Sequence, residues 1–246
     1  MSQFDGFDNM TELLVSLALK ELSKSVDIKG GKIQPTDLTQ SIVKKSIRSF
    51  YNSNQYRNSL SRYLKNIQDY DREKQAMYGK QNMSVSNITN AQQIAITEYI
   101  GYLNEAGINE RFNQPLRKAI SQNIRLGKSL SEIKDELSKF AEFKTNKSYF
   151  TQTAQQGADA YASIIDQKIM EKYRTKIKGL RIVGSIIETS SPQCVEAVEM
   201  GRDLTIEQWE KLLKKYKKQI IEGTTVENLA TYKLHIGCRH QFTPYL

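Results

Sequence analysis

All four cysteine and histidine side chains of this 246-residue chain lie in two short C-terminal segments. The first clip is Ser190-Ser191-Pro192-Gln193-Cys194, and the closing clip is His235-Ile236-Gly237-Cys238-Arg239-His240. Thiolates and imidazoles are the side chains that bind transition metals, and thiols can also form cross-links. The chemistry of the sequence is therefore concentrated at its C-terminal end.

These four side chains match the ligand number of a zinc site. Zinc takes four ligands in a tetrahedron, and Cys194, His235, Cys238 and His240 would supply them from two clips. The spacing differs from that of a zinc finger, because Ser191 occupies the position of the first cysteine in a Cys-x-x-Cys pair. The alternative is that both cysteines are small buried apolar residues while the histidines make local hydrogen bonds. Because single soft ligands at two distant positions make most sense if folding joins them, we expect Cys194 to lie near the His235–His240 turn, within reach of a shared metal or a disulfide.

Patterns for catalysis are weaker. Cys238 could act as a nucleophile with His235 or His240 as its base, but no orienting residue or oxyanion motif accompanies the pair. Carboxylates near the first clip show no acid–base pattern, and no phosphate-binding glycine loop is present; these carboxylates are Glu188, Glu196 and Glu199. The residues predict no enzyme.

Composition indicates a soluble protein with an anionic partner or an ordinary basic surface. The formal charge is +9, and a field of that sign attracts nucleic acid or acidic protein surfaces. The longest apolar run, residues 13–19, is too short to span a bilayer and lacks the flanks of a signal peptide. We therefore expect synthesis in the cytoplasm, no membrane contact, and thiols rather than a disulfide.

Hydrophobic spacing predicts a mainly helical α+β protein. Three- and four-residue steps and glycine or capping signals delimit the expected helices, and β-branched runs delimit the strands. The expected helices are about 13–29, 35–79, 90–106, 115–127, 130–143, 150–169 and 206–222, with a polar linker at 81–87. The expected strands are 180–187, 232–234 and 241–243.

Basic residues cluster in two stretches of the chain, and aromatic residues accompany the first of them. Residues 42–80 carry nine lysines and arginines against three acids, and residues 211–218 carry five lysines. Such clusters bind phosphates without reading sequence, or are simply solvated. Long amphipathic helices also suggest a partner chain, with aromatic side chains as anchors unless they fill the protein's own core; these are Phe50, Tyr51, Tyr56, Tyr63 and Tyr70.

The order of motifs resembles the head-morphogenesis (minor head) proteins of tailed bacteriophages, typified by the F protein of phage Mu. The resemblance covers about residues 110–246 and begins with Leu126–Ile133 and a helix bearing Thr151-Gln152-Thr153-Ala154. A strand follows, then the first clip and the closing His-x-x-Cys-Arg clip. Ser190 and Cys194 stand at the family's threonine and cysteine positions, and His235, Cys238 and Arg239 match its closing pattern.

The chain departs from the family pattern at several positions. Ile187 stands where an aspartate is expected, Thr189 replaces an arginine, Gln152 replaces a glutamate, and His240 replaces the last cysteine. These changes argue against an inherited catalytic or metal-binding role more than against the fold. Some relatives carry a fused toxin domain, and we expect none here because the chain ends soon after the closing clip.

Hydrophobic spacing predicts a helical region over 1–108, which would bind portal or capsid, and the resemblance implies a head-morphogenesis domain over 109–246. It also implies a non-enzymatic minor capsid protein inside the virion or at the portal. Its expected partners are the portal protein, the major capsid protein, or both, and it would also contact double-stranded DNA nonspecifically. The alternative from another class is a phage-delivered effector enzyme, either a nuclease or an ADP-ribosyltransferase-like toxin.

Overall fold

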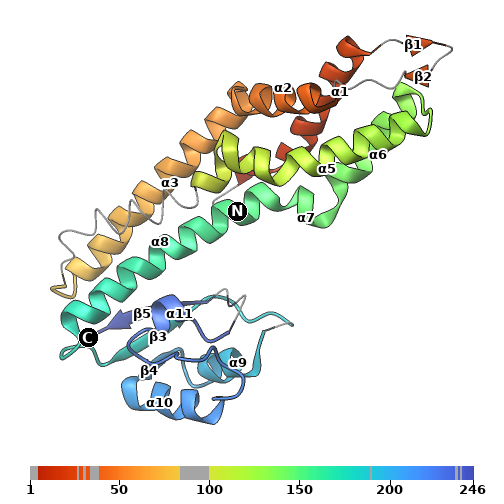
Figure 1. Cartoon of the computed structure of the whole chain (residues 1–246). Helices are drawn as coiled ribbons and strands as arrows, with labels where there is room; N and C mark the ends of the chain where they lie inside the picture. Colours follow the sequence, from red (N-terminus) through yellow and green to blue (C-terminus); the bar gives the residue numbers. More distant parts are fainter. Residues whose placement is uncertain are drawn as a thin grey trace. The chain divides into compact units, whose positions relative to one another are not determined.

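The computed structural model describes residues 5–26, 28–29, 32–33, 39–83, 100–188, 190–235, 238 and 240–246 (Figure 1). The chain is mainly helical and has a small three-stranded antiparallel sheet near its C-terminus, which confirms the predicted α+β class. None of the helices in these ranges combines the length and apolar character needed to cross a membrane.

Backbone contacts divide the chain into two compact units. The helical unit comprises Met1–Asn66 and Thr97–Gly157, and the sheet unit comprises Ile67–Ile96 and Ala158–Leu246. Each unit is thus built from two separate stretches of sequence. The predicted boundary between residues 108 and 109 falls inside a helix, so the division into 1–108 and 109–246 stays a prediction about function rather than a break in the fold.

The helical unit consists of α-helices, one 3₁₀ turn and a short β-hairpin around one core. Its elements are the 3₁₀ turn η1 (Asp5–Phe7), α1 (Met10–Ser25), the hairpin β1 (Ile28–Lys29) and β2 (Lys32–Ile33), α2 (Thr39–Tyr51), the first half of α3 (Asn54–Gly79), α5 (Glu105–Arg125), α6 (Leu130–Glu142), α7 (Lys144–Lys147) and the start of α8 (Tyr149–Tyr173). Helix α1 packs on α2 and α6, and α2 packs on α5. The predicted helix over 35–79 is therefore two helices, separated at Asn52 and Ser53.

Aromatic side chains form the centre of this unit. The ring of Phe50 lies 4.6 Å from that of Tyr56 and 5.3 Å from that of Phe150, and Phe112 stacks on Phe150 at 5.7 Å. The partner-anchor hypothesis is wrong for Phe50, Tyr56 and Tyr63, which are at most 2% exposed. Some of their ring partners are distant in sequence, as Phe150 is for Phe50 and Phe7 is for Tyr63, and helical periodicity alone does not reveal such pairs.

The capping boxes predicted at Ser129 and Thr205 are both present and start α6 and α10. The predicted start at Pro115 is wrong, because Asn104 caps α5 and accepts a hydrogen bond from the Gly107 N–H. Gly107 was expected to end a helix but lies in the first turn of α5. A Cβ there would lie 2.3 Å from the Gly101 carbonyl oxygen, so close backbone approach requires this glycine. Most of the predicted 81–87 linker and 90–106 helix lies in residues 84–99, outside the described residues.

The sheet unit places three strands between short helices. Strand β3 (Gly179–Val183) is central and pairs antiparallel with β4 (Asp203–Thr205) and β5 (Gln241–Tyr245). The helices are α9 (Pro192–Glu199), α10 (Ile206–Lys215) and α11 (Leu229–Tyr232), together with the second halves of α3 and α8. Trp209 of α10 is fully buried and donates its indole N–H to the Leu180 carbonyl at 2.8 Å, which fixes α10 to the sheet.

Two predicted strands need correction. The strand expected over 180–187 ends at Val183, because Gly184 adopts a φ of 139°. The strand expected over 232–234 is absent: Leu229–Tyr232 is helical, and Lys233 has a φ of 62° that ends the helix. The strand predicted at 241–243 is confirmed within β5.

A buried ion pair holds α3, α8 and β5 of the sheet unit together. The Lys74 ammonium lies 2.7 Å from an Asp166 carboxylate oxygen, and the two side chains are 6% and 1% exposed. Tyr78 donates to the same carboxylate, and Lys74 also lies 3.3 Å from Thr243 Oγ1. Burial raises the pKa of Asp166, while Lys74 and Tyr78 act against that rise.

Candidate metal centre

The first clip is positioned by the start of α9. Ser191 is the N-cap residue, Pro192 begins the helix, and the Cys194 N–H donates to the Ser191 carbonyl at 3.0 Å. Proline suits this place because its fixed φ is helical and the amide it lacks would have no intrahelical partner. Cys194 therefore occupies the first turn of α9, where it is fully buried.

The closing clip is a turn that leads into β5. The Cys238 N–H donates to the His235 carbonyl at 3.0 Å, which brings these two side chains to the same turn. Two residues later His240 precedes Gln241, the first residue of β5. Ile236, Gly237 and Arg239 of this clip lie outside the described residues.

Folding brings three of the four predicted ligands together. The ligand atoms of Cys194, His235 and Cys238 all lie within 4.8 Å of one another. The Cys194 sulfur is 3.5 Å from His235 Nε2 and 3.9 Å from the Cys238 sulfur. Both cysteines are free thiols, so no disulfide joins the clips. The expected meeting of Cys194 with the closing clip is confirmed, and this cluster could hold a metal ion.

The spacing of these atoms fits a tetrahedral ion. With zinc–sulfur bonds of about 2.3 Å and zinc–nitrogen bonds of about 2.05 Å, tetrahedral geometry separates two sulfurs by about 3.8 Å and a sulfur and a nitrogen by about 3.6 Å. The separations of 3.9 Å and 3.5 Å in the cluster match these edges. Soft sulfur and imidazole donors also suit zinc rather than magnesium or calcium.

His240 lies beside the cluster and outside its closest group. Its Nδ1 is 3.8 Å from the Cys238 sulfur, again close to a tetrahedral edge, but it does not lie within 4.8 Å of every other ligand atom. The ring is 5% exposed, and its Nε2 has no hydrogen-bond partner among the described residues. His240 is therefore the candidate for a fourth ligand.

Gly184 makes room for that ring. A Cβ at position 184 would lie 2.8 Å from His240 Cδ2, and the φ of 139° disfavours any other residue. The loop after β3 therefore presses against the imidazole. This contact was not predicted from the sequence, where Gly184 read only as part of a strand.

The two thiols share their protons unequally. The hydrogen bond between the sulfurs, helped by burial, raises the pKa of Cys194. The same hydrogen bond lowers the pKa of Cys238, and His240 lowers it further. A metal binds cysteine as thiolate, so a bound divalent ion would displace the protons that the two sulfurs carry.

Lys233 supports the closing clip from outside the ligand set. Its ammonium donates to the His240 carbonyl at 3.1 Å and lies 5.6 Å from the Phe242 ring centre. Burial lowers the pKa of Lys233, and nearby Cys238 and Asp166 oppose that change. Sequence reasoning missed Lys233, since a single lysine in a basic chain carries no signal of burial.

The carboxylates considered for catalysis do not join this centre. Glu188 and Glu199 are exposed, and Glu196 accepts hydrogen bonds at 2.6 Å from Lys215 and from Tyr216. The described metal-binding group contains cysteine and histidine alone. Comparison of the chain with family models, with curated proteins and with solved structures finds no match in any of the three. The assignment therefore depends on the residues and their geometry.

Proposed function

We propose that this chain is a minor head protein of a tailed bacteriophage, and that a structural zinc ion joins its two C-terminal clips. In this proposal the protein acts during head assembly with the portal protein, the major capsid protein, or both. It would reside inside the head or at the portal, after assembly in the host cytoplasm. The family part of the proposal rests on the motif resemblance of residues 110–246.

One observation carries the proposal. Cys194 and Cys238 are 44 residues apart in sequence, and both belong to the motifs that carry the resemblance, yet their sulfurs lie 3.9 Å apart. Motif residues that are far apart in sequence thus meet in one partly buried cluster. A metal that joins distant segments stabilises a small unit by its binding free energy. The sheet unit, with three short strands, is the kind of unit that benefits.

A structural role fits the surroundings of the centre better than a catalytic one. Cys194 and His240 are buried, and the described cluster offers no carboxylate as a general acid or base. Structural zinc sites use sulfur and nitrogen ligands in a closed shell, whereas catalytic sites keep one position open to water.

The effector-enzyme alternative has one observation in its favour. Only three ligand atoms form the closest group, and a Cys₂His set with a water as fourth ligand is a known catalytic arrangement. Under that alternative, His240 would stay out of the shell, and the loaded protein would cleave nucleic acid or modify a protein substrate. The effect of His240→Ala on zinc affinity separates the structural role from the catalytic one.

The test of the assembly role is the composition of particles. Phage particles from a culture that carries this gene would be treated with nuclease, banded by density and quantified by peptide mass spectrometry. The proposal expects this chain at a fixed, low ratio to the portal and major capsid proteins in every preparation. Its absence from full particles and from assembly intermediates would overturn the assembly role and leave the metal centre to be explained otherwise.

A further inference from the structure

One stretch of the helical unit is basic without interruption. Residues 39–66, which cover α2 and the first half of α3, contain no aspartate or glutamate. They carry six basic side chains, of which α2 holds half; the six are Lys44, Lys45, Arg48, Arg57, Arg62 and Lys65. All six are exposed. The stretch thus presents positive charge with no acid of its own to offset it.

The rest of its exposed surface is polar and uncharged. Every exposed residue of this stretch is lysine, arginine, serine, asparagine or glutamine. We call this set the basic face; its members are Gln40, Ser41, Lys44, Lys45, Arg48, Ser49, Asn52, Asn54, Gln55, Arg57, Asn58, Ser61, Arg62 and Lys65. None of the large apolar side chains exposed elsewhere in the described chain, such as Leu126 or Phe143, belongs to it.

The cations of the basic face are not neutralised by described carboxylates. Other basic residues in the helical unit have such partners, for example Lys24 with Glu21 and Lys128 with Glu136. Within the part of the chain that the structure describes, none of the six basic-face cations makes an ion pair. Arg57 instead donates to the neutral Asn52 side chain. These charges are therefore available to an external anion.

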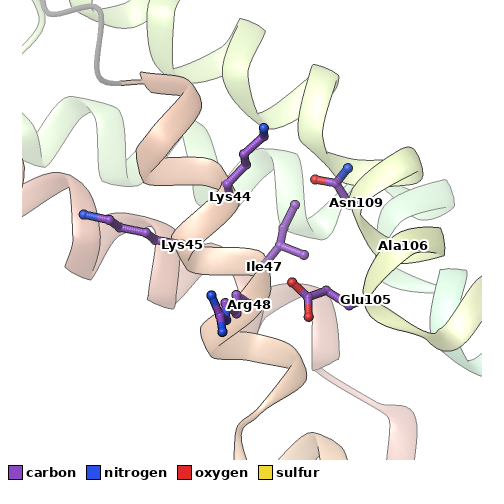
Figure 2. Close-up of a pocket in the computed structure, with 7 residues that line it drawn as sticks. All are labelled: Lys44, Lys45, Ile47, Arg48, Glu105, Ala106 and Asn109. Carbon is purple, nitrogen blue, oxygen red and sulfur yellow. The ribbon is translucent and has the colours of Figure 1, made fainter.

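Two hollows open next to the α2 cations. The larger, of about 550 Å³, lies between α2 and α5 and is lined by Lys44, Arg48, Glu105 and Asn109 among others (Figure 2). Figure 2 shows Lys44 and Asn109 reaching out from the two helices on either side of it. The smaller, of about 330 Å³, shares Lys45 and Arg48, adds Ser49 and Asn52, and is also lined by Glu21. Cations and neutral donors thus border two open hollows, each of which also has one carboxylate on its lining.

We propose that the basic face binds the phosphate backbone of a nucleic acid without reading its sequence. Lysine, arginine, serine, asparagine and glutamine are the side chains that contact phosphates. Protein interfaces are enriched in aromatic residues, methionine and arginine and depleted in lysine and serine. Among its exposed residues the basic face has arginine but no aromatic residue or methionine, and it is rich in lysine and serine. The composition of the face therefore favours a phosphate backbone over an acidic protein surface. The inference rests on the proposed head function only in identifying packaged DNA as the natural ligand.

The salt dependence of binding by the full chain provides the test, with a fluorescent duplex DNA of about two helical turns as the probe. Each phosphate neutralised by a cation contributes about −0.9 to the slope of log affinity against log salt. The variant Lys44→Gln/Lys45→Gln/Arg48→Gln should weaken binding and make the slope shallower by up to about 2.7. The reverse change, Glu105→Gln, removes the carboxylate that lines the larger hollow and should tighten binding at low salt.

A matched control removes the same charge from the sheet unit. Lys214, Lys217 and Lys218 are exposed and make no ion pair within the described residues, so Lys214→Gln/Lys217→Gln/Lys218→Gln lowers the net charge equally. The inference expects this control to keep the wild-type slope. Equal losses in both triple variants would show that net charge alone drives binding and would overturn the inference, as would no binding by the wild type.

A second arm decides the chemical class of the ligand. Polyglutamate at the same concentration of negative charge should compete poorly with the duplex if phosphates are the preferred partner. Competition as strong as that of unlabelled duplex would overturn the inference in favour of an acidic protein segment. Loss of DNA binding while the chain still enters particles would refute this inference alone, whereas DNA binding by a chain absent from particles would refute the assembly role alone.

Discussion

At the scale of single residues, the first clip contributes one side chain to the candidate metal centre and the closing clip contributes the others. Cys194 is the sole candidate ligand from the first clip, so Cys194→Ser should abolish the proposed zinc binding, because a hydroxyl is a poor zinc ligand. His240→Ala should lower zinc affinity by at least about 10-fold if its ring closes the shell. Competition with a chromophoric chelator measures both affinities.

The control for the Cys194→Ser and His240→Ala variants is Glu199→Gln on α9. Glu199 is exposed and lies outside the described metal-binding group, so zinc affinity should not change. Unaltered affinity in His240→Ala would contradict the closed shell and favour a water as fourth ligand, as in a catalytic site.

The sequence predicted the ligands but not their support. Cysteine and histidine are rare in this chain and gathered in two clips, so their chemistry was visible without a structure. Gly184 and Lys233 were not visible, because their importance comes from a backbone φ of 139° and a burial that only folding creates. The incomplete approach of His240 was also beyond sequence reasoning, since ligand type says nothing about a separation of a few ångströms.

At the scale of elements, the sheet unit is held by an ion pair whose burial is costly. Asp166→Ala would leave the Lys74 ammonium buried and unpaired, and should lower the free energy of unfolding by about 3–5 kcal/mol. Denaturant unfolding followed by circular dichroism measures the change. Glu207→Ala, which breaks the exposed pair with Lys211, should leave stability nearly unchanged because solvent screens the two charges.

Replacing both charged residues tests whether an unpaired buried charge causes the loss of stability. Because burial raises the pKa of Asp166 despite its partner, the pair does not fully offset its own desolvation. The double variant Lys74→Met/Asp166→Leu should therefore be more stable than Asp166→Ala. If the double variant is no better than the single one, an unpaired buried charge is not the reason for the loss.

A comparison of two glycine-to-alanine variants tests the close backbone contact at the start of α5. Gly107→Ala would place a Cβ against the backbone of Gly101 and Tyr102, and should cost about 1–3 kcal/mol of stability. Gly79→Ala, at the end of α3, meets no atom within 4 Å and should be neutral or stabilising by up to about 1 kcal/mol. Thermal unfolding of both variants would compare them, and equal effects would contradict the close approach at Gly107.

Most elements were predictable because their signals are local. Both capping boxes begin helices where their Ser/Thr-x-x-Glu/Gln patterns lie, and periodicity located most helices. The errors arose where tertiary contacts override local signals. Gly107 and Pro115 were read as a stop and a start, yet one long helix runs through both, because Asn104 caps it and its apolar face is buried.

At the scale of the whole molecule, the sequence predicted the mainly helical α+β class but not the two units of the fold. Each unit takes residues from two distant stretches, and α3 and α8 both contribute to each unit. Pairings such as Lys74 with Asp166, 92 residues apart, define the sheet unit and leave no trace in a local pattern. The aromatic residues of α2 and α3 were assigned to a partner for the same reason, although most of them fill the core.

The structure also describes how the charge of the chain is distributed, which the net charge alone does not. A net charge of +9 indicates an anionic partner in general terms. The structure adds that the basic face has neither acids nor exposed apolar side chains, whereas several lysines and arginines of the sheet unit are paired, such as Arg181 with Asp203. We therefore propose that the basic face is where the chain binds nucleic acid.

Native mass spectrometry of the intact, freshly purified chain tests the central claim most directly. If a structural zinc ion joins the two clips, the main species should be heavier than the bare chain by one zinc ion less the protons that it displaces. The Cys194→Ser variant should lack this species. A wild-type chain at its bare mass after zinc is supplied, or lighter by two hydrogens because a disulfide joins Cys194 to Cys238, would contradict the metal centre.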